Sequence, residues 1–184
     1  MAGKYQSITL ELGEIMRNLF FAFSFSVLST AAFAAQIDPA TTDFPWMNGP
    51  ARDSRYKLAD NVNKVHVFEA WSLSCSWCNR NAEQVVALAG EYAGDARVQF
   101  IDLGLDTSES SYVQWIQRHS PTYPVVKDLG RTVWSALQQD NGIPQTFVVD
   151  CAGHLVDYTI GYWGDSEKTT LRDAIARAKE TTCE

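Results

Sequence analysis

The chain has 184 residues, of which 46% are hydrophobic and 20% are charged, so it is long enough to bury a core and is unlike a disordered or collagen-like protein. Its formal net charge of −7 at pH 7 argues against a nucleic-acid-binding surface, because phosphates are bound mainly by Lys and Arg. The four cysteines comprise one close pair, Cys75 and Cys78, and two distant residues, Cys151 and Cys183, which indicates two separate roles.

The N-terminal segment has the pattern of a secretory signal peptide over residues 1–34. Arg17 is followed by an apolar run over residues 19–28 and then by small residues that end at Ala34, after which we expect cleavage. Met16 is an alternative start of translation. An uncleaved membrane anchor is the other interpretation, but the run is short for about 30 Å of hydrocarbon and is interrupted by serines. The sequence therefore predicts a periplasmic or secreted protein, in which distant cysteines can pair.

Two periodicities organise the rest of the chain. Residues 35–54 are rich in Pro, Asp, Asn and Gly, and we expect an irregular lead-in there. Later β-branched and aromatic runs predict strands, and apolar residues at helical spacing predict helices. In chain order we expect a strand over 64–71, a helix over 79–92, a strand over 98–103, a helix over 108–120, a strand over 124–126, a helix over 130–139, strands over 146–150 and 154–160, and a helix over 166–181.

This order predicts a single α/β domain over residues 55–184. Strands that alternate with helices pair in parallel, whereas the last two strands are joined by a tight turn and form an antiparallel hairpin. The expected fold is a three-layer α/β sandwich whose central mixed sheet ends in that hairpin.

Cys75 and Cys78 stand three positions apart between a predicted strand and a predicted helix. At a helix N-terminus, unpaired N–H groups and the helix dipole favour a thiolate. A Cys75 thiolate can attack a substrate disulfide, and Cys78 can then resolve the mixed disulfide. A zinc half-site and two buried structural cysteines are the alternatives, but the chain has no second close Cys or His pair to complete a zinc site. The spacing favours thiol–disulfide exchange with no metal and no cofactor.

Further residues accompany the pair in a recognisable order. Glu69 precedes Cys75 by six positions, and Gly142-Ile143-Pro144 precedes the strand predicted at 146–150. This pattern resembles the thioredoxin superfamily, over about residues 55–180. The resemblance is greatest to its exported TlpA-like branch, through the helix and Pro-Val-Val strand between residues 106 and 128, the Pro-x-Thr-Phe run and Tyr56-Lys57-Leu58.

The resemblance implies roles for several residues. The proline that matches Pro144 follows a cis peptide bond, faces the cysteines and exposes the backbone of Ile143 to a substrate segment. A plain strand-entry proline is the alternative. Glu69 matches a buried acid that moves protons to or from the second cysteine, and a solvent-facing strand residue is the alternative. We expect Trp77 either to contact a protein partner or to cap the pair.

Three positions depart from the nearest relatives. Ser74 stands where Trp is usual, Ser76-Trp77 stands where Gly-Pro or Gly-His is usual, and Asn81 stands where some TlpA-like reductases have an acid. The inner dipeptide and nearby charges help to set the thiolate pKa and the reduction potential. The exchange chemistry is therefore predicted, while the direction of electron flow stays open.

Three functions fit these observations. The first is a disulfide reductase or interchange enzyme that acts on protein thiols or disulfides, with apocytochrome c as one substrate class that the resemblance suggests and a membrane electron carrier as its reductant. The second is a disulfide oxidase or isomerase. The third is a binding module, such as a copper chaperone, without turnover. Copper-delivery relatives use a distant His, and His66, His119 and His154 are isolated here, but their cysteines are spaced one residue wider.

The two distant cysteines fall at positions that the predicted elements bring together. The strand at 154–160 spans about 23 Å away from its hairpin turn, and the helix at 166–181 spans about 24 Å back. We therefore expect a structural disulfide between Cys151 and Cys183, at the opposite end of the sheet from Cys75. Two free thiols are the alternative, which is disfavoured in an exported protein.

Overall fold

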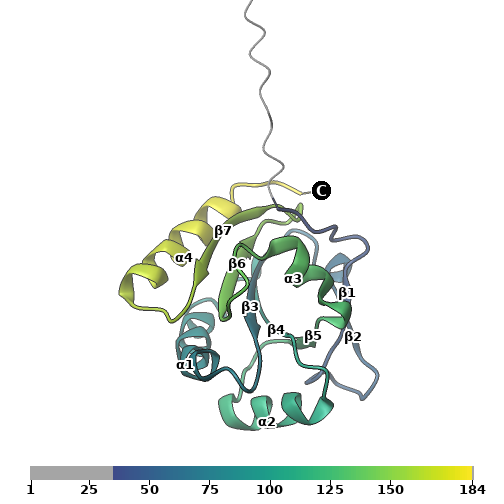
Figure 1. Cartoon of the computed structure of the whole chain (residues 1–184). Helices are drawn as coiled ribbons and strands as arrows, with labels where there is room; N and C mark the ends of the chain where they lie inside the picture. Colours follow the sequence, from purple (N-terminus) through teal and green to yellow (C-terminus); the bar gives the residue numbers. More distant parts are fainter. Residues whose placement is uncertain (1–34, 184) are drawn as a thin grey trace, which may run out of the picture. The chain divides into compact units, whose positions relative to one another are not determined.

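The computed structural model of the protein describes residues 35–183, so the predicted signal peptide lies outside the described part of the chain. In this part, a five-stranded sheet carries α-helices on its two faces (Figure 1). The strands of the sheet are β3 (Val65–Trp71), β4 (Val98–Gly104), β5 (Val125–Lys127), β6 (Gln145–Val149) and β7 (Leu155–Ile160), and the helices are α1 (Ser76–Glu91), α2 (Glu109–His119), α3 (Thr132–Leu137) and α4 (Asp165–Ala178).

The sheet has the strand order β5–β4–β3–β6–β7 and is mixed. β3 pairs in parallel with β4, and β4 pairs in parallel with β5. β6 pairs antiparallel with both β3 and β7. The last two strands, β6 and β7, therefore form the predicted antiparallel hairpin at one edge of the sheet. Between residues 35 and 183, no helix combines the length and the apolar character needed to cross a bilayer.

The lead-in at residues 35–54 is not wholly irregular, which corrects the expectation from its composition. Within it, β1 (Asp43–Pro45) pairs antiparallel with β2 (Arg55–Lys57) to form a separate two-stranded sheet. Phe44 and Tyr56 are partners in this register, and both side chains are buried. A three-residue strand with one inward aromatic residue has no periodicity to detect, so the pattern could not reveal it.

Two of the four helices begin more than one residue away from the expected start. α1 begins at Ser76 rather than at residue 79, because Cys75 itself caps the helix and accepts a hydrogen bond from the Cys78 backbone N–H. α3 is shorter than the predicted helix over 130–139. It begins at Thr132, after a 3-10 turn over Leu129–Arg131 in which Gly130 has a left-handed φ of 71°.

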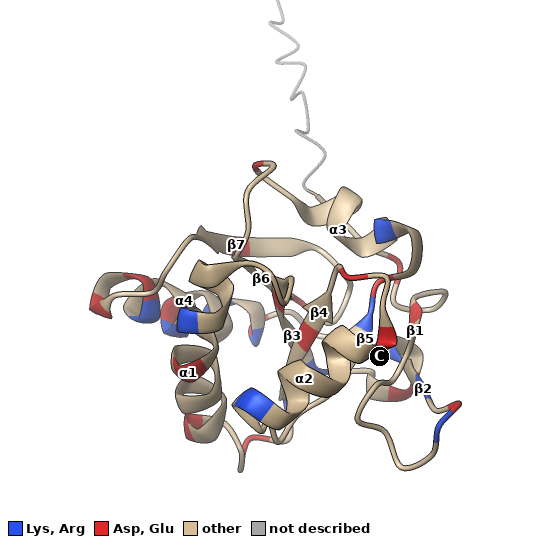
Figure 2. Ribbon diagram, turned by 60° about the horizontal axis from the view of Figure 1, so that its bottom comes forward, with Lys and Arg blue, Asp and Glu red and all other residues tan. Residues whose placement is uncertain are grey.

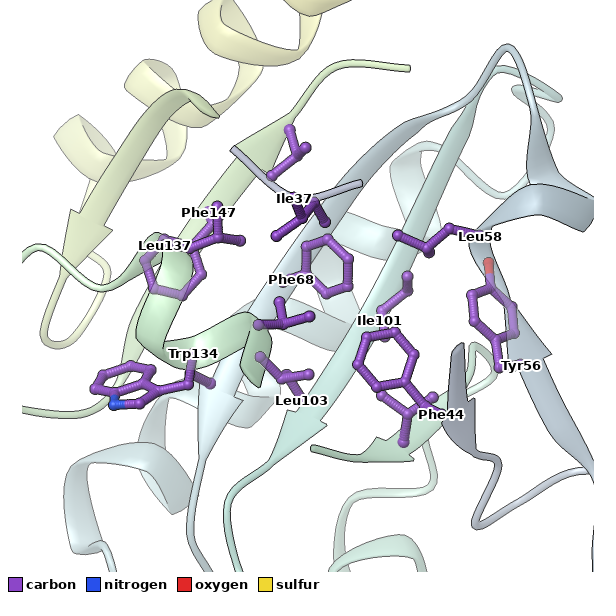
Figure 3. Packing of buried hydrophobic residues seen from close by; sticks show 14 of the residues in the cluster. Ile37, Phe44, Tyr56, Leu58, Phe68, Ile101, Leu103, Trp134, Leu137 and Phe147 are labelled. Carbon is purple, nitrogen blue, oxygen red and sulfur yellow. The ribbon is translucent and has the colours of Figure 1, made fainter. Parts of the chain in front are cut away.

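Side chains of the fully buried strand β3 alternate between two apolar layers. Phe68 points to one face, where it packs in a cluster with residues from β4, β6, α3 and the β1–β2 sheet (Figure 3). Val65 and Val67 point to the other face, where residues of α1 and α4 cover the sheet. The layers are therefore helix, sheet and helix, which confirms the predicted three-layer sandwich.

Candidate active site

Cys75 and Cys78 lie where β3 is followed by the first turn of α1, and a disulfide joins them with a Cα–Cα distance of 5.2 Å. Cys75 is the N-cap of α1, and its Sγ accepts a hydrogen bond from the Cys78 backbone N–H at 3.0 Å. Cys75 is partly exposed, whereas Cys78 is only 1% exposed. An approaching sulfur atom therefore meets Cys75 first. In the reduced protein, the free N–H groups of the helix end stabilise negative charge on its Sγ.

Polar side chains hold the turn that leads into Cys75. The Asp106 carboxylate accepts hydrogen bonds from the Ser72 hydroxyl at 2.6 Å and from the Leu73 backbone N–H at 2.9 Å. The Asn79 amide donates to the carbonyl oxygens of Leu73 and Cys75 at 2.9 and 2.8 Å. The start of α1 is thus fixed on both sides of the first cysteine, which keeps Cys75 at the helix N-terminus.

Ile143 and Pro144 face the cysteine pair from the turn before β6. The peptide bond between them is cis. The Ile143 carbonyl oxygen lies 3.6 Å from Cys75 Sγ, and Ile143 is partly exposed while Pro144 is buried. The structure therefore brings the Ile143 backbone beside the accessible cysteine, in the place that the resemblance implies.

Trp77 lies on the surface next to the pair and is 54% exposed. Its ring centroid is 6.4 Å from that of Tyr162, and the Arg80 guanidinium lies 5.2 Å above its ring. These residues line a depression of about 550 Å³ together with Asn79 and Glu83. Trp77 is therefore open to contact from solvent or from another molecule.

Glu69 is buried on β3, on the sheet face that α1 covers, and does not face solvent, since only 2% of it is exposed. Its carboxyl group accepts a hydrogen bond from the Asn81 amide at 2.8 Å and another from the Thr146 hydroxyl. Burial raises the pKa of Glu69 to about 8, and the two hydrogen bonds only partly oppose that rise. A carboxyl group with such a pKa can both give and take a proton near neutral pH.

Asn81 connects Glu69 to the segment before α4. It is fully buried, and its side-chain oxygen accepts a hydrogen bond from the Trp163 backbone N–H at 2.9 Å. The Trp163 indole in turn donates to the Thr146 hydroxyl at 3.0 Å. The sequence pattern marked Asn81 only as a departure from an acid in relatives, and it did not mark Thr146 or Trp163 as part of the site.

A second acid, Asp102, lies next to Glu69 in the sheet. The two residues are register partners on β3 and β4, and Asp102 is also only 2% exposed. Figure 2 shows acidic segments inside the otherwise mostly uncharged central sheet. The Trp115 indole donates to the Asp102 carboxyl at 2.7 Å. Burial raises the pKa of Asp102 to about 7, although hydrogen bonds from Trp115 and Tyr123 oppose the rise. Its signal in the sequence is an acid inside the apolar run over residues 98–103.

Most of the described part of the chain matches a known protein family. The model of the AhpC/TSA family matches residues 40–158, which is more than half of the chain and includes the cysteine pair, both buried acids and Pro144. The chain belongs to the AhpC/TSA family. No curated protein sequence matches it.

Solved structures share the fold of this AhpC/TSA family member at low sequence identity. A thiol:disulfide interchange protein of the thioredoxin family from Chlorobium tepidum is 15% identical, with a TM-score of 0.63 over 80% of this chain and 99% of that one. A secreted Mycobacterium tuberculosis disulfide oxidoreductase homologous to E. coli DsbE is 13% identical, with a TM-score of 0.58 over 76% and 97%. A secreted thiol-disulfide isomerase from Corynebacterium glutamicum is 16% identical, with a TM-score of 0.64 over 79% and 86%. The chain thus has the thioredoxin-like fold and the Cys-x-x-Cys pair of thiol–disulfide oxidoreductases.

The other two cysteines of this family member form a second disulfide, between Cys151 and Cys183. Cys151 follows β6, whose last residue, Val149, pairs with His66 near the start of β3. This disulfide therefore lies at the opposite end of the sheet from Cys75, at the place expected from the lengths of the last strand and helix. Gly153 completes the turn beside it, with a φ of 90°, and its carbonyl accepts a hydrogen bond from the Ile37 N–H at 2.9 Å.

The three histidines lie in different surroundings. His66 is buried on β3 and stacks on Phe68, and burial lowers its pKa to about 4. His119 packs against Trp115, and His154 lies beside Asp150. Across residues 35–183 no three His, Cys, Asp or Glu side chains are grouped so as to hold a metal ion.

Proposed function

We propose that the protein is an exported thiol–disulfide oxidoreductase that exchanges disulfides with protein substrates through Cys75 and Cys78, as a reductase or interchange protein. The observation that supports this proposal most strongly is the difference in exposure between the two cysteines. Cys75 is partly exposed at the N-cap of α1, 3.6 Å from the Ile143 carbonyl oxygen, whereas Cys78 is buried one turn further on. This asymmetry supports attack by Cys75 and resolution by Cys78.

The reaction in the reducing direction has two steps. The Cys75 thiolate attacks a substrate disulfide, so that a new S–S bond joins Cys75 to the substrate and one substrate sulfur leaves as a thiolate. Cys78 then loses its proton to Glu69, and its thiolate attacks Cys75 Sγ and releases the second substrate sulfur. Two electrons pass to the substrate, and the Cys75–Cys78 disulfide must then be reduced again by a thiol donor, for which we propose a membrane electron carrier.

The segment around Cys75 supports a protein substrate. An extended substrate strand can pair with the Ile143 backbone beside Pro144, and Trp77 with Tyr162 offers an exposed aromatic contact. A protein segment makes use of both features, whereas a small disulfide needs only the exposed Cys75 sulfur atom.

A trapping experiment tests the mechanism directly. The Cys78→Ser variant is incubated with insulin and analysed on a non-reducing gel, and the adduct is located by mass spectrometry. We expect a covalent adduct at Cys75, because the resolving thiol is missing. The Cys75→Ser variant is the matched control and should give no adduct. An adduct that forms at Cys78 in that control would reverse the assignment of the two cysteines.

The direction of electron flow is tested by the reduction potential of the pair against glutathione. A reductase requires a value near that of thioredoxin, about −270 mV, whereas a value near about −120 mV belongs to an oxidant and would favour the oxidase alternative. A copper(I) titration of the reduced protein that gives tight binding, with no turnover of insulin, would instead support a copper chaperone.

Export is proposed from the signal-peptide pattern over residues 1–34. The test is N-terminal sequencing of the protein recovered from the periplasm or medium of an expressing bacterium. We expect a mature chain that begins at residue 35. Recovery of the chain in the membrane fraction with its N-terminal segment intact would support the anchor instead.

A further inference from the structure

Two buried carboxyl groups lie side by side on one face of the sheet. Glu69 and Asp102 are register partners on the parallel strands β3 and β4, so their side chains project to the same face. Each is 2% exposed. The facing helix is α1, whose buried residues include Cys78 and Asn81. Because these two are three positions apart, they lie on one side of the helix, and Asn81 contacts Glu69 directly.

The groups that face the two acids are acidic or neutral. Glu69 receives hydrogen bonds from Asn81 of α1 and Thr146 of β6. Asp102 receives one from Trp115 of α2, and the hydroxyl of Tyr123, before β5, lies beside it. Within residues 35–183, no Lys, Arg or His contributes to the pKa of either carboxyl group, and the charge of Asp102 itself raises the pKa of Glu69.

This arrangement penalises the state in which both acids are ionised. Two carboxylates in a low-dielectric interior repel each other, and here no cation offsets the repulsion. The hydrogen-bond donors beside each acid stabilise the charge of that acid alone. None of them bridges the two carboxyl groups to offset their mutual repulsion. Such a pair releases its protons in two coupled steps that belong to the pair rather than to either residue.

We propose that Glu69 and Asp102 form an electrostatically coupled carboxyl pair that carries one proton in total around neutral pH, and that Asp102 acts as a positioning residue which controls when Glu69 can accept the proton of Cys78. The inference rests on the proposed exchange function for its consequence in the reaction, but the pairing itself is a property of the oxidised protein. In the resolving step, the Cys78 proton moves to an ionised Glu69 while the one proton that the pair already carries is on Asp102.

The test is the titration of both carboxyl groups in the oxidised protein by ¹³C NMR. In the Asp102→Asn variant, the amide keeps an acceptor for Trp115 and removes the charge. We expect Glu69 to titrate at least about one pH unit lower than in the wild type, the coupling at which two sites behave as a pair. Reciprocally, Glu69→Gln should lower the titration of Asp102. This second measurement decides the question if Asp102→Asn does not fold.

Asp128→Asn is the matched control, because Asp128 is a buried acid that instead binds the N-terminus of α3 through the Val133 and Trp134 N–H groups. It should leave the Glu69 titration unchanged. If Asp102→Asn also leaves it unchanged, the carboxyl pair is refuted.

Exchange kinetics separate this inference from the proposed function. The pH profile of insulin reduction should move to lower pH in Asp102→Asn, and Asp102→Asn should have no further effect in a Glu69→Gln background. A wild type that does not reduce insulin, with coupled titrations intact, would contradict the proposed function alone. A wild type that reduces insulin, with independent titrations, would contradict the carboxyl pair alone.

Discussion

The two ends of the sheet carry the same covalent bond in opposite settings. The Cys75–Cys78 disulfide joins residues three apart at the start of α1, the helix that contacts the buried acid Glu69 through Asn81. The Cys151–Cys183 disulfide joins residues 32 apart and ties the β6–β7 turn to the chain after α4. The first leaves one sulfur accessible at a helix N-terminus, whereas the second closes a long loop of chain.

The carboxyl groups near each disulfide differ in what they bind. At the far end, Asp150 accepts hydrogen bonds from the backbone N–H groups of Ala152 and His154 and from the Thr181 hydroxyl, so it fixes the turn and the C-terminal segment together. At the cysteine end, Glu69 binds only side-chain donors in the interior and has its pKa raised by burial. The Cys151–Cys183 disulfide thus lies beside a carboxyl group that fixes the backbone, whereas the Cys75–Cys78 disulfide lies at the end of the sheet with a buried titratable acid.

The largest expected difference between the two ends is in exchange activity. Cys75→Ser should reduce the rate of insulin reduction to that of the uncatalysed reaction, because no other accessible sulfur lies at the site. The double variant Cys151→Ser/Cys183→Ser should keep the wild-type rate at a temperature where it is folded. Measured turbidity of reduced insulin checks both, and loss of activity in the double variant would mean that the far disulfide takes part in exchange.

Stability should respond in the opposite order. Opening a loop of 32 residues is expected to lower the free energy of unfolding by about 3–4 kcal/mol, and opening the short Cys75–Cys78 loop by about 2 kcal/mol. Urea denaturation of Cys151→Ser/Cys183→Ser and of Cys75→Ser/Cys78→Ser, compared with the wild type, measures both changes. An equal or larger loss for the Cys75–Cys78 pair would contradict the view that Cys151–Cys183 is the structural disulfide and Cys75–Cys78 the reactive one.

The pH dependence of stability should report the buried acid at the cysteine end. The pKa of Glu69 is about 8 and that of Asp102 about 7 in the folded protein, against ordinary values of 4.5 and 3.8, so the folded state binds more protons over that window and loses stability as pH rises. His66 acts in the opposite sense below pH 6.5, because its pKa is lowered on folding. Between pH 6.5 and 8, the free energy of unfolding of the oxidised protein should therefore fall by up to about 2 kcal/mol.

Denaturant titrations at several pH values test this slope. Glu69→Gln should remove most of the fall between pH 6.5 and 8, since a neutral amide replaces the group that ionises. Asp128→Asn, which removes a buried carboxylate that binds the Val133 and Trp134 N–H groups, should lower stability without changing the slope. A slope that survives in Glu69→Gln would assign the effect to another group.

Much of this contrast was predictable from the sequence, because its signals are local. The fold was predicted from the alternation of strands and helices together with the Cys-x-x-Cys spacing. The same spacing and the Ile143-Pro144 pair predicted which segments lie on the two sides of Cys75. The position of Cys183 followed from the lengths of one strand and one helix. These features depend on the order of elements along the chain, and that order can be read from the sequence without knowing how the elements pack.

The buried polar network was harder to predict, because its members are distant in sequence. Asp102 meets Glu69 only through the register of β3 with β4, and Trp163 meets Asn81 across 82 positions. An acid inside an apolar strand does signal burial, but its partners depend on tertiary packing. The β1 strand was missed for the same reason, since only its pairing with β2 distinguishes it from a loop.

The smallest predicted effect concerns the surface beside the cysteines. Trp77→Ala should raise the KM for a protein substrate roughly fivefold, the equivalent of about 1 kcal/mol for an exposed aromatic contact, and leave kcat unchanged. Turnover of oxidised glutathione, which is too small to reach across the Trp77–Tyr162 patch, should not change. Val62 is a comparably exposed apolar residue before β3, at the end of the sheet opposite Cys75, and Val62→Ala should affect neither substrate. Equal losses with insulin and glutathione in Trp77→Ala would instead indicate that Trp77 acts on the cysteines, for example by capping the pair.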